Sequence, residues 1–183
     1  MNKIGTRTIC TDRCVLRRIA PEDYREMYES WAKYEEVCRY FPFHPVSDVE
    51  MYREKVHGWV GNYESDTYFH WVIEWKDGGE LIGTINLGNV EESCQMSDTC
   101  YMLSPRYWGK GIMTEVLRAV LEYAFCEIGL NRVQAEVFEG NAASVRVLKK
   151  CGMQQEGVAR QKYYKDGAFI DAQLYAVLRE EFV

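Results

Sequence analysis

The sequence predicts one domain, spanning residues 1–183, of the α/β (α+β) class, with helices covering a mixed, mostly antiparallel sheet. Two patterns carry this prediction. Short runs with apolar residues at every second position, separated by polar turns, indicate an antiparallel meander in the middle of the chain. A strand, a glycine turn, a long amphipathic run and another strand then follow, which predicts a central β-α-β crossover. With 47% hydrophobic residues, the chain can bury one substantial core.

The composition argues against several classes of function. A net charge of −6 disfavours binding to nucleic-acid phosphates and favours a cationic, amine-bearing partner. The seven cysteines are scattered without a C-x-x-C pair, and the three histidines lack ligand spacing, so we expect reduced thiols and no metal site. No signal pattern opens the chain, and no apolar run reaches the roughly 18 residues that cross a bilayer. We therefore expect a cytoplasmic protein that does not bind membranes.

The N-terminal part is predicted to be mainly helical after one strand. Residues 13–19 alternate as a strand does, and Pro21 with the acidic residues after it suits the first turn of a helix over residues 21–33. Residues 34–45 combine aromatic side chains with prolines that interrupt regular structure. This aromatic segment is interpreted either as a core plug or as the wall of a substrate pocket.

The meander begins after a second helix. Ser47 and Glu50 have the spacing of a capping box, which predicts a helix from there to about residue 63. Residues 68–75 have a period of two and read as a half-buried strand. The turn at residues 76–79 then leads into a returning strand at 81–87.

The second half of the chain contains the crossover. Apolar residues recur every four positions from Ile112 to Ile128, and Gly129 ends the helix. Because this helix joins two strands, those strands should be parallel. The predicted elements are a turn at 89–93, a strand at 98–103, this helix, a strand at 132–138, a helix from the N-cap Asn141 to Lys150, and a C-terminal hairpin of strands 153–164 and 169–178.

The turn before the long helix, residues 106–111, is the strongest functional signal. Gly109 and Gly111 leave backbone N–H groups free at the positive end of a helix, which predicts an anion-binding cradle. A dinucleotide fingerprint would need G-x-G-x-x-G near the first strand, and a P-loop would need Lys-Ser/Thr where Ile112 and Met113 stand. Nucleotide-dependent enzymes are therefore disfavoured.

These features resemble the GNAT acetyltransferases, and within them the branch of the RimJ and RimL ribosomal-protein N-terminal acetyltransferases. The resemblance covers residues 13–178 and rests on the order of elements, the R-x-x-G-x-G turn at 106–111, the run 107–115, the helix start Asn141-x-x-Ser144, and Gly152. It implies the GNAT acyl-CoA N-acyltransferase fold, with a splayed parallel strand pair. It also implies transfer of an acetyl group from acetyl-CoA, as co-substrate, to a primary amine by direct attack in a ternary complex.

The resemblance further implies which residues meet acetyl-CoA. Main-chain N–H groups of the cradle would hold the pyrophosphate, Arg106 would add a charge-assisted contact, and unpaired strand groups would bind pantetheine and the acetyl carbonyl. Asn141 is a natural N-cap whose amide could also reach pantetheine. The implied coenzyme-binding residues are Met102, Leu103, Arg106, Gly109, Lys110, Gly111, Ile112, Met113, Thr114, Asn141 and Ser144.

Two residues are candidate catalysts. Asp98 stands where many family members have a glutamate base; because it is one methylene shorter, we expect it to act through a water, unless it is only a polar strand residue. Ser144 matches a serine near the coenzyme sulfur and is either an acid or a structural residue of its helix. Other branches use a tyrosine where this chain has Leu148.

That departure keeps open a second class, a catalytically silent CoA-binding sensor or partner protein. The acceptor, a protein N-terminus or a small-molecule amine, is not identified by the sequence; its selectivity would come from residues 34–45 and the last hairpin. A homodimer formed through the C-terminal strands is compatible with the resemblance.

Overall fold

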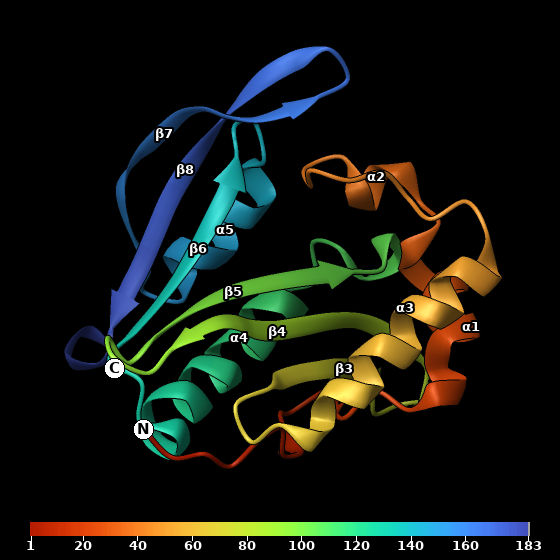
Figure 1. Ribbon diagram of the computed structural model, residues 1–183, viewed down its shortest axis with the longest axis horizontal. Helices are drawn as coiled ribbons and strands as arrows, with labels where there is room; N and C mark the ends of the chain where they lie inside the picture. Colours follow the sequence, from red (N-terminus) through yellow and green to blue (C-terminus); the bar gives the residue numbers. More distant parts are fainter. Residues whose placement is uncertain (183) are drawn as a thin grey trace.

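An eight-stranded mixed sheet organises the protein in the computed structural model, which describes residues 1–182 (Figure 1). The strand order is β1-β2-β3-β4-β5-β6-β8-β7, and every neighbouring pair is antiparallel except β5 and β6. The predicted fold class and the central crossover are therefore confirmed. The strands are Ile9–Cys10 (β1), Cys14–Arg17 (β2), Phe69–Trp75 (β3), Leu81–Glu91 (β4), Met96–Leu103 (β5), Arg132–Phe138 (β6), Gln154–Lys165 (β7) and Ala168–Leu178 (β8).

Helices cover both faces of the sheet, α1 and α3 on one side and α4 and α5 on the other (Figure 1). The α-helices are Tyr24–Met27 (α1), Glu35–Cys38 (α2), Val49–Gly61 (α3), Ile112–Glu122 (α4) and Ala142–Lys150 (α5). Helix α1 follows a 3-10 turn, Pro21–Asp23, and continues as a π-helical turn, Tyr28–Ala32; α4 continues in the same way through Tyr123–Ile128. None of the helices within residues 1–182 is long and apolar enough to traverse a bilayer.

Strand β3 is buried on both faces, so the prediction of a half-buried strand is wrong. Trp71 packs into the cluster beneath α4, whereas Val72 belongs to the cluster beneath α1 and α3. His70 is also buried and its Nε2 lies 2.8 Å from the hydroxyl of Thr84. Burial lowers the pKa of His70 to about 4, so its ring is neutral at physiological pH. The alternating residues of β3 therefore face two different apolar clusters, and neither face of the strand is exposed to solvent.

Two local boundaries also differ from expectation. The N-cap of α3 is Asp48, not Ser47, and its carboxylate accepts from the N–H groups of Glu50 (2.7 Å) and Met51 (3.2 Å). Strand β4 extends into the predicted turn at 89–93 and ends at Glu91, so the turn itself occupies residues 92–95. Asn89 makes this extension irregular, since it adopts a left-handed φ of 48°.

The parallel strands β5 and β6 separate soon after they meet. Pairing covers only Met96–Asp98 against Arg132–Gln134. Beyond this point β5 follows its antiparallel partner β4, while β6 follows β8, so the two halves of the sheet diverge (Figure 1). The predicted splay is confirmed, and Asp98 lies at its vertex.

Candidate functional site

The glycine turn forms an open cradle at the start of α4. Gly109 and Gly111 both have φ of +75°, a conformation that glycine adopts without steric cost, and Gly111 is the N-cap of the helix. Within residues 1–182, no protein group accepts from the backbone N–H groups of Gly109 through Thr114. Six unpaired donors at the positive end of a helix therefore provide the geometry that an anionic group such as a pyrophosphate requires.

Arg13, which immediately precedes β2, contacts this cradle and the first turn of α4. Its backbone N–H and its Nε donate to the two carboxylate oxygens of Glu115 at 2.9 and 2.7 Å, and its Nη1 donates to the carbonyl of Lys110 at 3.0 Å. Burial alone would raise the pKa of Glu115, but hydrogen bonds from Thr11 and Arg13 hold that pKa below its usual value. A Cβ built on Gly111 would lie 3.9 Å from Nη2 of Arg13, so the guanidinium borders the cradle.

We predict that Arg13→Gln weakens the binding of CoA about tenfold. The glutamine loses the charged contacts to Glu115 and Lys110 that pre-organise the loop, and removes a positive charge beside the anion site. Isothermal calorimetry with CoA measures the effect. Arg53→Gln is the control, because Arg53 forms an exposed ion pair with Glu50 on α3; equal affinities of the two variants would disprove the role of Arg13.

The main chain of β5 offers hydrogen-bonding groups to the splay. Ser104 donates to Ile82 of β4 at 2.7 Å, and Met102 pairs with Thr84. Because partners alternate along an antiparallel ladder, the amide groups of Met102 face β4 and those of Tyr101 and Leu103 face β6. The Leu103 carbonyl already accepts from the Trp108 indole at 2.8 Å. This geometry moves the expected main-chain contact from Met102 to Tyr101 and leaves the N–H of Leu103 facing the splay.

Asp98 is held by two amides at the vertex of the splay. Its Oδ1 accepts from Gln134 of β6 at 2.7 Å and its Oδ2 accepts from Asn89 of β4 at 2.6 Å. The side chain is therefore fixed in orientation, with each oxygen keeping one lone pair for a water molecule. This arrangement suits the relayed role expected for Asp98 better than direct contact with a nucleophile.

Ser144 lies in the first turn of α5, next to the N-cap Asn141. The side-chain oxygen of Asn141 accepts from the N–H of Ser144 at 3.1 Å, as predicted for an N-cap. The Ser144 hydroxyl in turn lies 2.8 Å from the phenol oxygen of Tyr101 on β5. Leu148, which stands where other branches have a tyrosine, is completely buried in the core.

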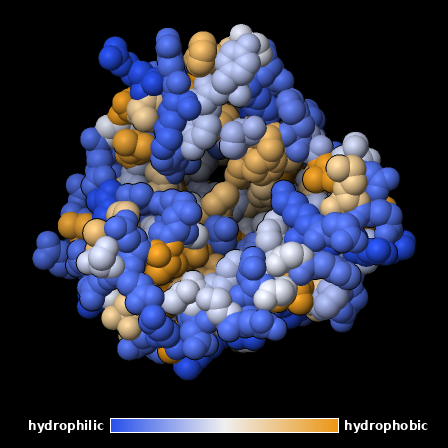
Figure 2. Space-filling view, viewed as in Figure 1, coloured by the Kyte–Doolittle hydropathy of each residue, from blue (hydrophilic) through white to orange (hydrophobic). Residues whose placement is uncertain are grey.

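A hollow opens at the splay on the face of the sheet that bears α1 and α3 (Figure 2). Cys100 of β5 reaches the surface there, but partial desolvation of its thiol, and then the negative charge of Asp98, raise the pKa of that thiol to about 11, so it is a poor nucleophile. Glu136 of β6 accepts from the phenol of Tyr163 at 2.7 Å and also contacts Lys162. Burial, and then the negative charges of Glu136 and Asp98, raise the pKa of Tyr163 to about 12. Two carboxylates thus converge on one end of the hollow.

The aromatic side chains of the segment 34–45 do not form a core plug, although Val37 of the same segment is buried in the cluster beneath α1 and α3. The segment contains α2, and its Phe41 and Phe43 rings stack on each other 5.1 Å apart without entering either core cluster. A buried ammonium, that of Lys165 at the tip of the β7–β8 hairpin, fastens the segment in place. It donates to the carbonyls of Cys38 (2.8 Å), Phe43 (3.3 Å) and Arg39 (3.4 Å).

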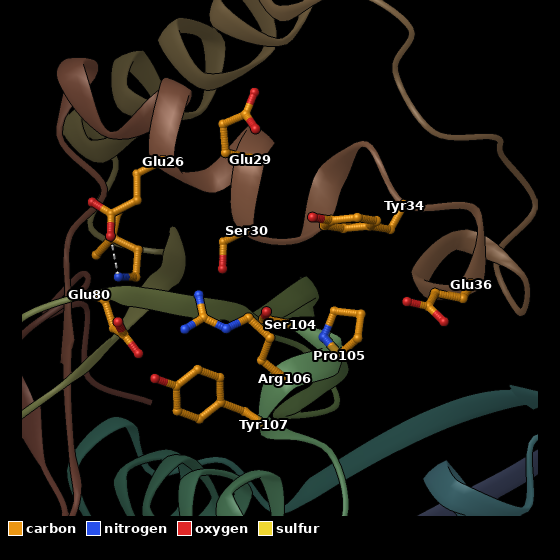
Figure 3. Close-up of a pocket in the computed structure, with 11 residues that line it drawn as sticks. Glu26, Glu29, Ser30, Tyr34, Glu36, Glu80, Ser104, Pro105, Arg106 and Tyr107 are labelled. Carbon is orange, nitrogen blue, oxygen red and sulfur yellow. Dashed lines mark hydrogen bonds between the residues drawn. The ribbon is translucent and has the colours of Figure 1, made fainter.

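Arg106 does not extend along the cradle but lines a separate acidic pocket of about 370 Å³ (Figure 3). Its guanidinium lies beneath Ser30 and beside the Tyr107 ring (Figure 3). Within residues 1–182 it makes no hydrogen bond or ion pair. The acidic side chains that line this pocket are Glu26, Glu29, Glu36 and Glu80.

Sequence patterns missed three residues of the site. Arg13, Tyr101 and Lys165 each act through a partner more than 40 positions away. The sequence places Lys165 next to a hairpin turn, which indicates no further role for it. Tyr101 lies in a strand for which only main-chain contacts were predicted. The alternation of β5 could have indicated Tyr101, because it places that ring on the same face as the helix that follows the crossover.

Comparisons with known proteins agree with this geometry. The family model described as Acetyltransferase (GNAT) domain matches residues 13–154. The chain is 32% identical over 169 residues to the uncharacterized N-acetyltransferase YoaA of Bacillus subtilis, covering 92% of this chain and 95% of that protein. It is 25% identical over 180 residues to the [ribosomal protein uS5]-alanine N-acetyltransferase of Escherichia coli, covering 92% and 89%.

A solved structure with the same fold is Mycobacterium smegmatis RimJ in complex with CoA-disulfide. It superposes with a TM-score of 0.86 at 24% sequence identity, covering 96% of this chain and 88% of that one. At this sequence identity, the similarity shows the fold alone.

Proposed function

Since this chain belongs to the GNAT acetyltransferase family and is an acetyl-CoA-dependent N-acetyltransferase, we propose that it acetylates a primary amine by direct attack in a ternary complex. The observation that carries the proposal is the splay between β5 and β6. The open cradle and Ser144 lie toward its α4–α5 face, and the hollow, with Asp98 and Glu136 near it, opens on the opposite face. Donor and acceptor would therefore approach one gap from two sides.

The cradle and the edge of β5 would hold the donor. Acetyl-CoA carries an anionic pyrophosphate, which fits the unpaired N–H groups of Gly109 to Thr114 beside the positive charge of Arg13. The N–H of Leu103 would donate to the acetyl carbonyl and stabilise the negative charge that develops there during attack. Asn141 and Ser144 line the opposite wall of the gap, on α5.

Asp98 would accept the proton of the attacking amine through a water. Amines react only in the neutral form, so a base or a water chain must remove one proton. Asp98 is oriented by Asn89 and Gln134 at the vertex where the two strands separate, which supports this role. The protonated thiol of Cys100 is unsuited to form an acyl intermediate, which supports direct transfer.

The acceptor we propose is a cationic amine, either a protein N-terminus or a small molecule. The overall charge of −6, the carboxylates at the hollow and the four glutamates of the neighbouring pocket favour such a molecule electrostatically. The similarity to the [ribosomal protein uS5]-alanine N-acetyltransferase of Escherichia coli favours a protein N-terminus as the acceptor. Release of CoA thiol in the presence of peptides with N-terminal alanine or serine, compared with polyamines, distinguishes the two.

We predict that Asp98→Asn lowers kcat about 100-fold at neutral pH, with little change in the KM for acetyl-CoA. The amide keeps the shape and a contact to Gln134 but cannot take up a proton from water. Measuring thiol release with the best acceptor of the panel checks this. Asp171→Asn, at an acid of β8 that accepts from the backbone of Gln161, is the control.

The same assay tests the proposed class of acceptor. If no amine in the panel releases thiol while calorimetry detects CoA binding, the proposal of a protein N-terminus or a polyamine as acceptor fails. If thiol is released and the Asp98→Asn variant has the same kcat as the unaltered protein, the proposed transfer to an amine is supported but the proposed role of Asp98 is wrong.

A further inference from the structure

A half-buried tyrosine contacts the hydroxyl of Ser144, the residue that the resemblance to the acetyltransferases places near the coenzyme sulfur. The phenol oxygen of Tyr101, on β5, and the hydroxyl oxygen of Ser144, on α5, are 2.8 Å apart. The two residues come from opposite walls of the splay and are 43 positions apart in the sequence. Their contact bridges the α4–α5 side of the gap.

The available partners indicate which of the two hydroxyl groups donates this hydrogen bond. Within residues 1–182 the Tyr101 hydroxyl has no partner other than Ser144. A phenol is a stronger hydrogen-bond donor and a weaker acceptor than an aliphatic hydroxyl, because its oxygen lone pair is delocalised into the ring. Tyr101 therefore donates and Ser144 accepts. The hydrogen of Ser144, which is only partly buried, is left free to point into the gap.

The environment keeps the Tyr101 phenol protonated. Burial raises its pKa far above the usual value and outweighs the hydrogen bond with Ser144, which acts in the opposite direction. A phenol this weakly acidic does not protonate a thiolate, whose conjugate thiol is a much stronger acid. Tyr101 is suited to hold a hydrogen bond throughout a reaction rather than to give up its proton.

We infer that Tyr101 is a positioning residue that directs the hydroxyl of Ser144 toward the sulfur of CoA, so that Ser144 stabilises the departing thiolate. This inference rests on the proposed function. The amine nitrogen forms the new bond to the acetyl carbon, the carbon–sulfur bond breaks with its electron pair on sulfur, and the amine proton leaves through water at Asp98. Ser144 donates a hydrogen bond to the sulfur without losing its proton, and Tyr101 holds the Ser144 hydroxyl in that orientation.

The pKa of the bound CoA thiol is the direct readout. If Ser144 donates to sulfur, the thiolate is favoured and the bound thiol has a lower pKa than free CoA. Tyr101→Phe, which keeps the ring but frees the Ser144 hydroxyl to rotate, and Ser144→Ala should each raise that pKa by about one unit, corresponding to a tenfold change in the ionisation constant. Ultraviolet thiolate absorbance of CoA bound to each protein, followed against pH, measures this without any acceptor.

Tyr175→Phe is the matched control, because Tyr175 is buried in the same sheet and its phenol contacts Gln173 and Gln155 away from the splay. The double variant Tyr101→Phe, Ser144→Ala should match Ser144→Ala, since Tyr101 acts only through Ser144. Identical thiol pKa values in Tyr101→Phe and in the unaltered protein would overturn the inference. Failure to bind CoA at all would instead overturn the proposed function, and calorimetry on the same samples detects that first.

Discussion

Replacing Gly111 by valine is expected to weaken CoA binding by at least about 100-fold. The residue has φ of +75° and caps α4 at the centre of the six unpaired N–H groups. A β-branched side chain there both opposes this backbone conformation and occupies the space through which a phosphate would approach. Loss of two charge-assisted hydrogen bonds, at roughly 1.5–3 kcal/mol each, accounts for the size of the effect. Calorimetry with CoA measures it.

Gly129→Val separates the cradle from general backbone strain. Gly129 ends the same helical segment with φ of +82°, and a Cβ there would make only ordinary contacts with Arg179 and Met1. Both variants should lose similar stability in urea, but Gly129→Val should keep the affinity of the unaltered protein for CoA. Equal affinity in the two variants would mean that the phosphates bind elsewhere.

Replacing Lys165 by methionine is expected to lower the free energy of unfolding by about 2 kcal/mol and to loosen the segment 34–45. The buried ammonium satisfies three carbonyl groups of that segment, and methionine fills a similar volume without donating to any of them. Urea denaturation measures the stability, and amide exchange of Arg39 to Phe43 measures the loosening.

Lys162→Met provides the comparison on the same strand. Lys162 is largely exposed and pairs with Glu136, an interaction that solvent screens, so its loss should change stability by less than about 1 kcal/mol. If the segment 34–45 selects the acceptor, Lys165→Met should also raise the KM for the amine and leave CoA affinity unchanged. Unchanged exchange at Arg39 to Phe43 would show that the aromatic segment holds its position without Lys165.

The crossover and its glycine turn could be predicted from sequence because their signals are local. The period of four from Ile112 to Ile128 and the two glycines before it depend only on near neighbours in the chain. The same is true of Asn141, which caps α5 as expected. Where two residues compete for one local role, pattern alone is insufficient: Ser47 and Asp48 both suit an N-cap, and the carboxylate of Asp48 prevails.

The walls of the site could not be predicted because tertiary contacts set them. Nothing near Arg106 in the sequence indicates that its side chain lies in an acidic pocket, since Glu26, Glu29 and Glu36 come from an N-terminal segment folded against it. The direction of the main chain at Met102 depends on its register with β4. The burial of His70 likewise follows from helices that cover the second face of the sheet.

The central claim is that the donor's phosphates bind at the turn between β5 and α4. Titrating CoA into the ¹⁵N-labelled protein and following backbone amide resonances tests it most directly. The account predicts that the largest shifts fall on Gly109, Lys110, Gly111, Ile112, Met113 and Thr114, the groups that have no acceptor within the described chain. Saturable shifts centred elsewhere, with these six amides unmoved, would contradict it.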